Sequence, residues 1–194
     1  MPTTGRRRPL WRVCPARHPQ PWWFSSRDQA PDPGRFDLVG PDGTGYWTLS
    51  PAAALIEVTA DPDQDDPPVL TVHALARLRV WRADIVPAAR SGLADTTRAS
   101  VPRLTGEIGT IVPYDLPWQW ADEFARHGRS GVLYRGRFSL AESVALFGPA
   151  GTSADPPAAD HQPATAIVDQ LLAPFRAGIG TVGPLDQLPR AAAP

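Results

Sequence analysis

The chain has 194 residues, a length that fits one domain with a short extension. Its formal net charge is -1, so bulk attraction to nucleic acid is not expected and no direct nucleic-acid binding is predicted. Cys14 is the single cysteine, which excludes an internal disulfide, and no cysteine, histidine or acid has metal-ligand spacing, so no metal site is predicted.

The first half of the chain predicts two strands and a helix. Leu10 to Cys14 favours a strand, and so does Gly45 to Leu49. Ser50-Pro51 then supplies a capping side chain and a proline at the first helical position, which predicts a helix over Ala52 to Thr59.

The second half mixes strands and helices. Alternating apolar residues predict strands over Val69 to Leu75 and Leu78 to Ile85. Leu116 to His127 predicts an amphipathic helix, and Gly131 to Phe138 a strand. Leu140 to Phe147 is compatible with a helix or a final strand. Since no regular βαβ alternation emerges, the expected fold class is α+β.

Composition divides the chain into three parts. Residues 1–9 are expected to be a disordered basic lead, residues 10–148 the folded domain, and residues 149–194 a Pro/Ala-rich linker and tail with a short helix. The linker is expected over Gly151 to Ala164 and the tail helix over Ile167 to Arg176. With no signal peptide and no apolar run long enough to span a bilayer, we expect a soluble cytoplasmic protein without membrane contact.

Glu57 is a lone carboxylate in an otherwise apolar predicted helix. It either faces water as part of a solvated helix face or is held in a cleft. In a cleft it could stabilise an oxocarbenium-like centre while a glycosidic bond breaks, or orient an attacking group. The residue alone does not decide between the two.

Arginines and a tyrosine accompany this acid. All 19 basic residues are arginine, whose planar fork suits phosphate oxygens, so Arg12 and Arg35 could clamp a pyrophosphate. Tyr46 could stack on a cationic nicotinamide ring. Arg137 could meet phosphate or a carboxylate. The alternatives are ordinary surface arginines and a core tyrosine.

Taken in order, these fragments resemble the RES-domain family. The fragments are Leu10-Trp11-Arg12, Arg35-Phe36-Asp37, Gly45-Tyr46-Trp47 with Glu57, and Gly131 to Arg137 closing at Leu146-Phe147. The resemblance covers about residues 10–148 and rests on the order and spacing of the set.

The resemblance implies an α+β fold with a mixed or antiparallel sheet core and flanking helices, similar to ADP-ribosyltransferases. It also implies a bacterial toxin that cleaves NAD⁺ at the nicotinamide–ribose bond, with inorganic phosphate or water as the acceptor, or that transfers ADP-ribose to a protein. NAD⁺ is then substrate, no further cofactor is needed, and the partner is an antitoxin with an Xre-like helix-turn-helix region. By this resemblance, the catalytic residues would be Glu57, Tyr46 and Arg12. The residues that bind NAD⁺ would be Arg12, Arg35, Tyr46 and Arg137.

One position departs from the family pattern. The family's serine is expected where this chain has Gly136, and Ser139 lies nearby out of register. A glycine donates no side-chain hydrogen bond. A binding protein with a decayed site is therefore a further alternative.

Overall fold

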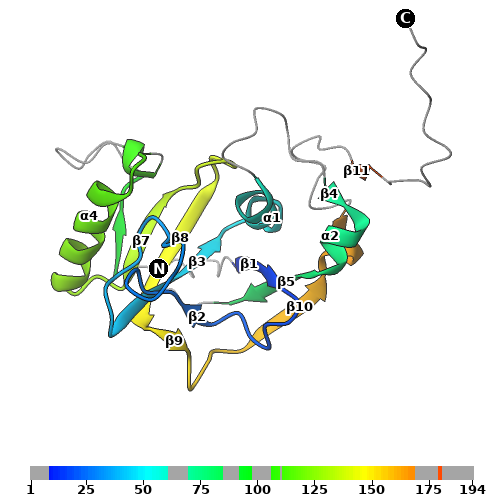
Figure 1. Ribbon diagram of the computed structural model, residues 1–194, viewed down its shortest axis with the longest axis horizontal. Coiled ribbons are helices and arrows are strands. Elements are labelled where there is room, and N and C mark those ends of the chain that lie inside the picture. The colour runs from blue at the N-terminus through cyan, green and yellow to red at the C-terminus, as the bar shows by residue number, and fades with distance from the viewer. Residues whose placement is uncertain are drawn as a thin grey trace, which may run out of the picture.

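The computed structural model describes residues 9–60, 70–84, 92–97, 106–109, 111–168 and 179–180. The expected lead, apart from Pro9, and most of the expected tail helix lie outside these ranges. Strands and helices mix around one large sheet, which confirms the α+β prediction (Figure 1). No helix in the described ranges is both long and apolar enough to cross a membrane.

Seven strands form the main sheet, in the order β10-β5-β1-β3-β8-β7-β6. Every neighbouring pair is antiparallel except β6 and β7, which are parallel. The strands are β1 (Leu10–Pro15), β3 (Asp42–Thr48), β5 (Leu78–Ala83), β6 (Leu93–Asp95), β7 (Gly131–Arg135), β8 (Glu142–Pro149) and β10 (Ala159–Pro163).

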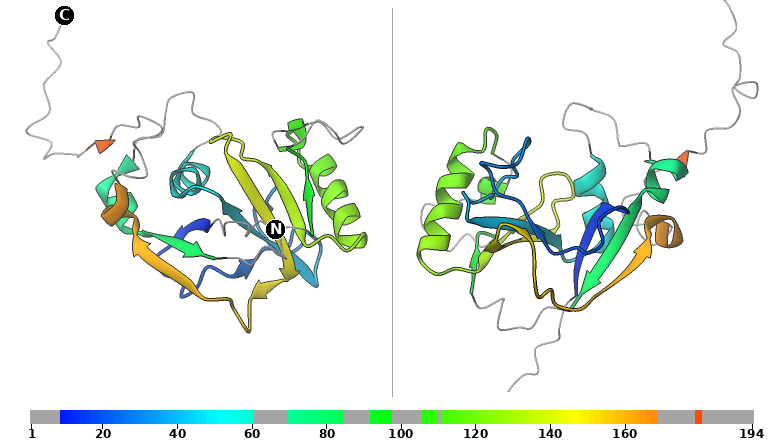
Figure 2. Two further views of the ribbon diagram at one scale, coloured as in Figure 1. Left: turned by 180° about the vertical axis from the view of Figure 1, so that it is seen from behind. Right: turned by 60° about the horizontal axis from the view of Figure 1, so that its bottom comes forward.

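The sheet splits between β1 and β3. These two strands share a single register pair, Trp11 opposite Thr48, whereas β3 is paired with β8 along its whole length. The right-hand view of Figure 2 shows the result, two arms that diverge in a V with helix α1 between them. The split exposes side chains of both strands to the space beside α1.

Helix α1 (Pro51–Thr59) begins as the sequence predicts. Ser50 is its N-cap, and the Ser50 hydroxyl accepts from the Ala53 amide at 3.5 Å. Residues 52–56 are buried, and Ala54 and Leu55 pack with Val13 of β1 and with Val80 of β5. Burying one leucine side chain stabilises a fold by about 1.5–3 kcal/mol. This apolar face fixes α1 inside the V and leaves its last turn toward the split.

Helix α4 (Asp115–Arg126) covers β7 on the other arm (Figure 1). Pro117 is tolerated because the first turn of a helix has amide groups without intrahelical acceptors. Ala121 is buried in the core of this arm, and Asp122 receives a 2.7 Å hydrogen bond from Arg27. The helix prediction for this segment is confirmed.

The segment around residue 72 differs from the prediction. A strand was expected over Val69 to Leu75, but the structure has a two-residue strand, β4 (Leu70–Thr71), followed by helix α2 (Val72–Ala76). The Thr71 hydroxyl accepts from the Ala74 amide at 3.1 Å, so this threonine caps a helix. The expected strand from Gly131 also ends early, at Arg135, and the residues from Glu142 form a strand.

The expected linker after Gly148 is instead part of the fold. β9 (Gly151–Thr152) pairs with β2 (Trp23–Phe24), and β10 pairs with β5 at the edge of the main sheet. The Trp22 indole donates to the Pro157 carbonyl at 2.8 Å. An edge strand tolerates proline and polar residues, so composition alone made this strand resemble a linker. The remaining short elements are η1 (Gly106–Gly109), η2 (Ala164–Ile167) and β11 (Ile179–Gly180).

Candidate active site

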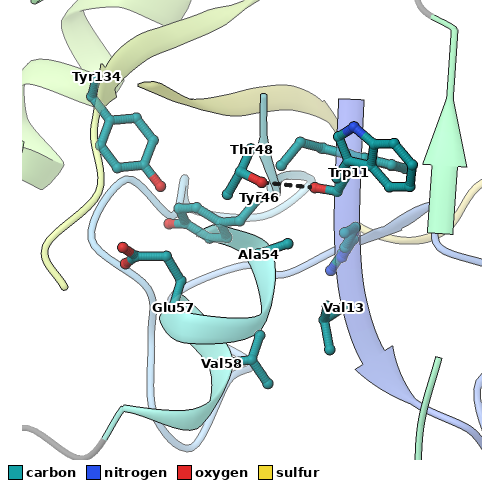
Figure 3. Close-up of a pocket in the computed structure, with 10 residues that line it drawn as sticks. Trp11, Val13, Tyr46, Thr48, Ala54, Glu57, Val58 and Tyr134 are labelled. Carbon is teal, nitrogen blue, oxygen red and sulfur yellow. Dashed lines mark hydrogen bonds between the residues drawn. The ribbon is translucent and has the colours of Figure 1, made fainter. Parts of the chain in front are cut away.

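A cavity of about 230 Å³ lies at the split in the sheet (Figure 3). It is bounded by β1, by β3 and the helix α1 that follows it, and by β7, so three separate stretches of the sequence contribute. Its lining residues are Trp11, Arg12, Val13, Tyr46, Trp47, Thr48, Ala54, Glu57, Val58 and Tyr134. The loss of β1–β3 pairing therefore creates the space, and α1 supplies its acidic group.

Glu57 lies in the last turn of α1 and is held by one oxygen. Its Oε1 accepts from the Ser139 amide at 2.8 Å, the Ser139 hydroxyl at 2.7 Å and the Phe138 amide at 3.2 Å. Among the described residues, none donates to Oε2. A carboxylate near a helix C-terminus meets an unfavourable dipole, and these three donors offset that cost. One oxygen is thus fixed, while Figure 3 shows the carboxylate directed into the cavity, toward the Tyr134 hydroxyl.

Gly136 makes this arrangement possible. A Cβ at this position would fall on Glu57 Oε1 and 2.8 Å from Ser139 Oγ. The Gly136 amide donates to the Ala141 carbonyl at 2.9 Å, which closes a loop over residues 136–141. Leu140 has a φ of 54°, which is unusual for a residue with a side chain. The chain therefore turns tightly here, and the turn brings Ser139, rather than a side chain at 136, onto Glu57.

Tyr46 lines the cavity with its ring and fixes a turn with its hydroxyl. The hydroxyl donates to Asp37 Oδ1 and accepts from the Phe36 amide, both at 2.8 Å. Asp37 Oδ2 accepts from the Gly34 amide at 2.8 Å. Burial raises the pKa of Tyr46 well above its ordinary value and also raises the pKa of Asp37. The Tyr46 hydroxyl is therefore committed to protein groups, and its ring is what a ligand would meet.

Arg12 is anchored by part of its guanidinium group. Its Nη1 donates to the Pro21 carbonyl at 2.6 Å and the Trp23 carbonyl at 2.9 Å. The guanidinium carbon lies 5.9 Å from the centroid of the Trp47 ring. Burial lowers the pKa of Arg12 from its ordinary value, though an arginine stays charged in proteins. These contacts fix the cation in the cavity wall through Nη1, and no described residue accepts from its other N–H groups.

Arg35 and Arg137 lie outside the walls of this cavity. Arg35 is buried, and its Nη1 donates to the Ile111 carbonyl at 2.8 Å while the guanidinium packs 4.7 Å from the Tyr114 ring centroid. Arg137 is half-buried with its guanidinium 5.2 Å from the Phe138 ring centroid. The structure thus gathers Arg12, Tyr46 and Glu57, and uses Arg35 to tie two segments together.

Two residues at the site were not singled out for it by the sequence. Tyr134 is buried and lies edge-on to Phe36 with centroids 4.9 Å apart. Burial raises the pKa of Tyr134, and the charge of Glu57 adds to this rise. The sequence pattern that could have identified Tyr134 is the alternation along β7, which puts Val132 and Tyr134 on one buried face. Ser139 carried no such signal, since its role depends on the turn.

Comparisons with known proteins give a family match and a similar fold. The model of the RES domain matches residues 9–179, a range that includes β10 as well as the elements around the Glu57 cavity. No curated protein matches the chain. A chain in the crystal structure of the M. tuberculosis MbcT–MbcA toxin–antitoxin complex is similar in fold, with a TM-score of 0.58 and 12% identity over 85% of this chain and 88% of that one. On the strength of the RES-domain match, which spans most of its length, this chain belongs to the RES-domain family.

Proposed function

We propose that this protein is an NAD⁺-consuming toxin that cleaves the bond between nicotinamide and ribose. The observation that supports it best is the arrangement at Glu57. Three donors hold one carboxylate oxygen, and the other lies toward a cavity walled by aromatic rings and Arg12. A fixed negative charge of this kind stabilises a positive centre that develops on a bound substrate.

In the proposed step, the bond between ribose C1′ and the pyridinium nitrogen breaks. The bonding electron pair leaves with the nitrogen, so nicotinamide departs as a neutral molecule and C1′ becomes an oxocarbenium-like centre. Glu57 stabilises that positive charge, as carboxylates do when glycosidic bonds are cleaved. Nicotinamide in NAD⁺ is cationic, and the Tyr46 and Tyr134 rings offer faces that attract a cation.

The acceptor completes the reaction. With water, the oxygen bonds to C1′, one proton is released, and the product is ADP-ribose. With inorganic phosphate, a phosphate oxygen bonds to C1′ and the product is ADP-ribose 1″-phosphate. Within the described part of the chain, the Arg137 guanidinium has no hydrogen-bond or ion-pair partner, and it follows the loop glycine directly, so it is our candidate for an anionic acceptor.

A decayed site has less support than the sequence suggested. The reason for considering it was the missing serine side chain at position 136. Ser139 provides a hydroxyl to Glu57 from three residues further on, and a side chain at 136 would collide with the same carboxylate. Gly136 therefore fits a site in use.

We further propose that the protein is paired with an antitoxin that has an Xre-like helix-turn-helix region. Membership of the RES-domain family supports this, as does the similar fold found in a toxin–antitoxin complex. Induced expression should arrest bacterial growth, and a Glu57→Gln variant expressed to the same level should not. Co-expression of a helix-turn-helix protein encoded beside the gene should restore growth. Absence of growth arrest by the wild type would contradict the toxin proposal, and equal growth arrest by the variant would contradict the role proposed for Glu57.

The direct test is product analysis with purified protein and NAD⁺, in buffers with and without phosphate. We expect nicotinamide release in wild type and its loss in Glu57→Gln. ADP-ribose without added phosphate indicates hydrolysis, and ADP-ribose 1″-phosphate indicates phosphorolysis. Transfer of label from NAD⁺ to protein would indicate ADP-ribosylation instead of hydrolysis or phosphorolysis. Absence of nicotinamide release from folded, partner-free protein under all of these conditions overturns the proposed activity.

A further inference from the structure

A second cavity of about 260 Å³ adjoins the first. The two share Arg12, Val13 and Val58 in their walls, so they lie on either side of the same stretch of β1 and the same turn of α1. The other lining residues of the second cavity are Cys14, Pro15, His18, Gln20, Pro21 and Trp23. Glu57 does not line this second cavity.

Arg12 connects the two cavities. Its Nη1 is bound to the carbonyl oxygens of Pro21 and Trp23, which belong to the wall of the second cavity. Its guanidinium also packs on Trp47, which belongs to the wall of the first. A positive charge therefore stands at the junction, where a ligand that occupied both cavities would pass.

The two cavities differ in charge. Glu57 is the charged group that the first cavity adds to Arg12, and it suits a cationic ligand. The second cavity has no acid among the described residues that line it, and it adds His18 to Arg12. It therefore suits an anionic or neutral group, and Trp23, which is 47% exposed, offers a ring for stacking.

We propose that the second cavity receives the adenosine monophosphate half of NAD⁺, with the pyrophosphate beside Arg12 and the adenine stacked on Trp23. This inference rests on the proposed function. Ligand pockets usually measure roughly 300–1,000 Å³, so neither cavity alone is suited to a whole dinucleotide. Together they match its charge sequence, with the cationic nicotinamide beside Glu57 and the anionic pyrophosphate at the junction.

The kinetic test compares NAD⁺ with nicotinamide mononucleotide, which has the same scissile bond and lacks the adenosine monophosphate half. The measured quantity is the ratio of kcat/KM for NAD⁺ to kcat/KM for the mononucleotide. Loss of one stacking platform costs about 1–3 kcal/mol, so Trp23→Ala should lower this ratio by roughly tenfold, mainly through the KM for NAD⁺. Trp23→Phe should restore most of it, and Leu116→Ala, a similarly exposed residue on α4, should leave it unchanged. An unchanged ratio in Trp23→Ala overturns the inference.

A binding test separates this inference from the proposed activity. Adenosine 5′-monophosphate titrated into the full-length protein should bind wild type and Glu57→Gln equally, and should bind Trp23→Ala at least fivefold more weakly, an affinity change of about 1 kcal/mol. This result would stand even if NAD⁺ were not cleaved. Failure of the nucleotide to bind wild type at millimolar concentration, or equal binding by folded Trp23→Ala, would overturn the second site while leaving Glu57 chemistry intact.

Discussion

Two carboxylates within one small domain have opposite environments. Asp37 is fully buried, and both of its oxygens accept from protein groups, Oδ1 from the Tyr46 hydroxyl and Oδ2 from the Gly34 amide. Glu57 is half-buried, and a single oxygen accepts all three of its bonds. The first arrangement uses the whole carboxylate to hold a turn. The second holds the group in place and keeps one oxygen for the cavity.

The difference separates structural polar groups from functional ones. A buried carboxylate whose oxygens both accept from protein groups has little capacity left for a ligand. One that is fixed on one side only is preorganised, because its position is set before substrate arrives. If this contrast is correct, changes around Glu57 should act on turnover and changes around Asp37 should act on stability.

Apart from the loss of the Glu57 charge itself, the largest effect should come from Gly136→Ala. The added Cβ would displace the Glu57 carboxylate, and a 1 Å misplacement near the chemistry can cost on the order of 10²-fold in rate. Turnover should therefore fall by about a hundredfold or more, with a loss of about 1–3 kcal/mol in unfolding free energy from overpacking. Gly128→Ala is the control, since Gly128 has a φ of 71° but open space around its Cβ position, so this variant should lose stability and retain turnover. Normal turnover in folded Gly136→Ala would contradict the claim that the tight loop positions Glu57 for turnover.

Ser139→Ala should have the next largest effect. A hydrogen bond to a charged group contributes about 1.5–3 kcal/mol, so turnover should fall by roughly ten- to hundredfold, while the two amide bonds to Glu57 remain. Ser139→Thr keeps the hydroxyl and should recover part of the loss. Steady-state kinetics of the two variants measure the contribution of the hydroxyl to turnover. Equal rates for the alanine and threonine variants would show that the hydroxyl has no part in the reaction.

Tyr46→Phe should act mainly on stability. It keeps the ring in the cavity but leaves Asp37 Oδ1 and the Phe36 amide without their partner. An unsatisfied buried group costs about 1–3 kcal/mol, so the free energy of unfolding measured by denaturation should fall by that amount. Turnover in fully folded protein should change less than it does in Ser139→Ala. The reverse order of effects on turnover would place the Tyr46 hydroxyl in the chemistry.

The smallest effect should be a pH dependence at Asp37. Burial raises the pKa of Asp37 above its ordinary value of 3.8, so the folded protein binds this proton more readily than the unfolded chain does. Above the folded-state pKa the ionised side chain costs stability, and acidification removes that cost. Wild type should therefore gain stability relative to Asp37→Asn as pH falls from 7 toward 4. A constant difference between the two denaturation curves would contradict this.

Local signals in the sequence predicted α1, α4 and most strands of the sheet. Ser50-Pro51 identified the start of α1, and with it the place of Glu57 near the end of a buried helix. Arg12, Tyr46 and Glu57 were all proposed from sequence, and the structure brings them to one cavity.

What the sequence could not predict depends on tertiary contacts. Ser139 meets Glu57 across 82 positions, and the tight turn from Gly136 determines that meeting. The edge strand β10 has the composition of a linker because an edge needs little apolar surface. Arg35 had the side chain for a phosphate clamp, but its burial against the Ile111 carbonyl follows from packing that no local pattern encodes.

The most direct test of the account measures binding and turnover of NAD⁺ together, in wild type and Glu57→Gln. Glutamine keeps the size of the side chain and an acceptor for the loop but removes the charge. We predict that the variant still binds NAD⁺ with an affinity within severalfold of wild type, while its turnover falls by about a thousandfold or more, in line with the loss of a preorganised charge. Glu123→Gln, at a partly exposed residue of α4 that does not line the cavity, should match wild type in both. Turnover by Glu57→Gln at the wild-type rate would contradict the central claim.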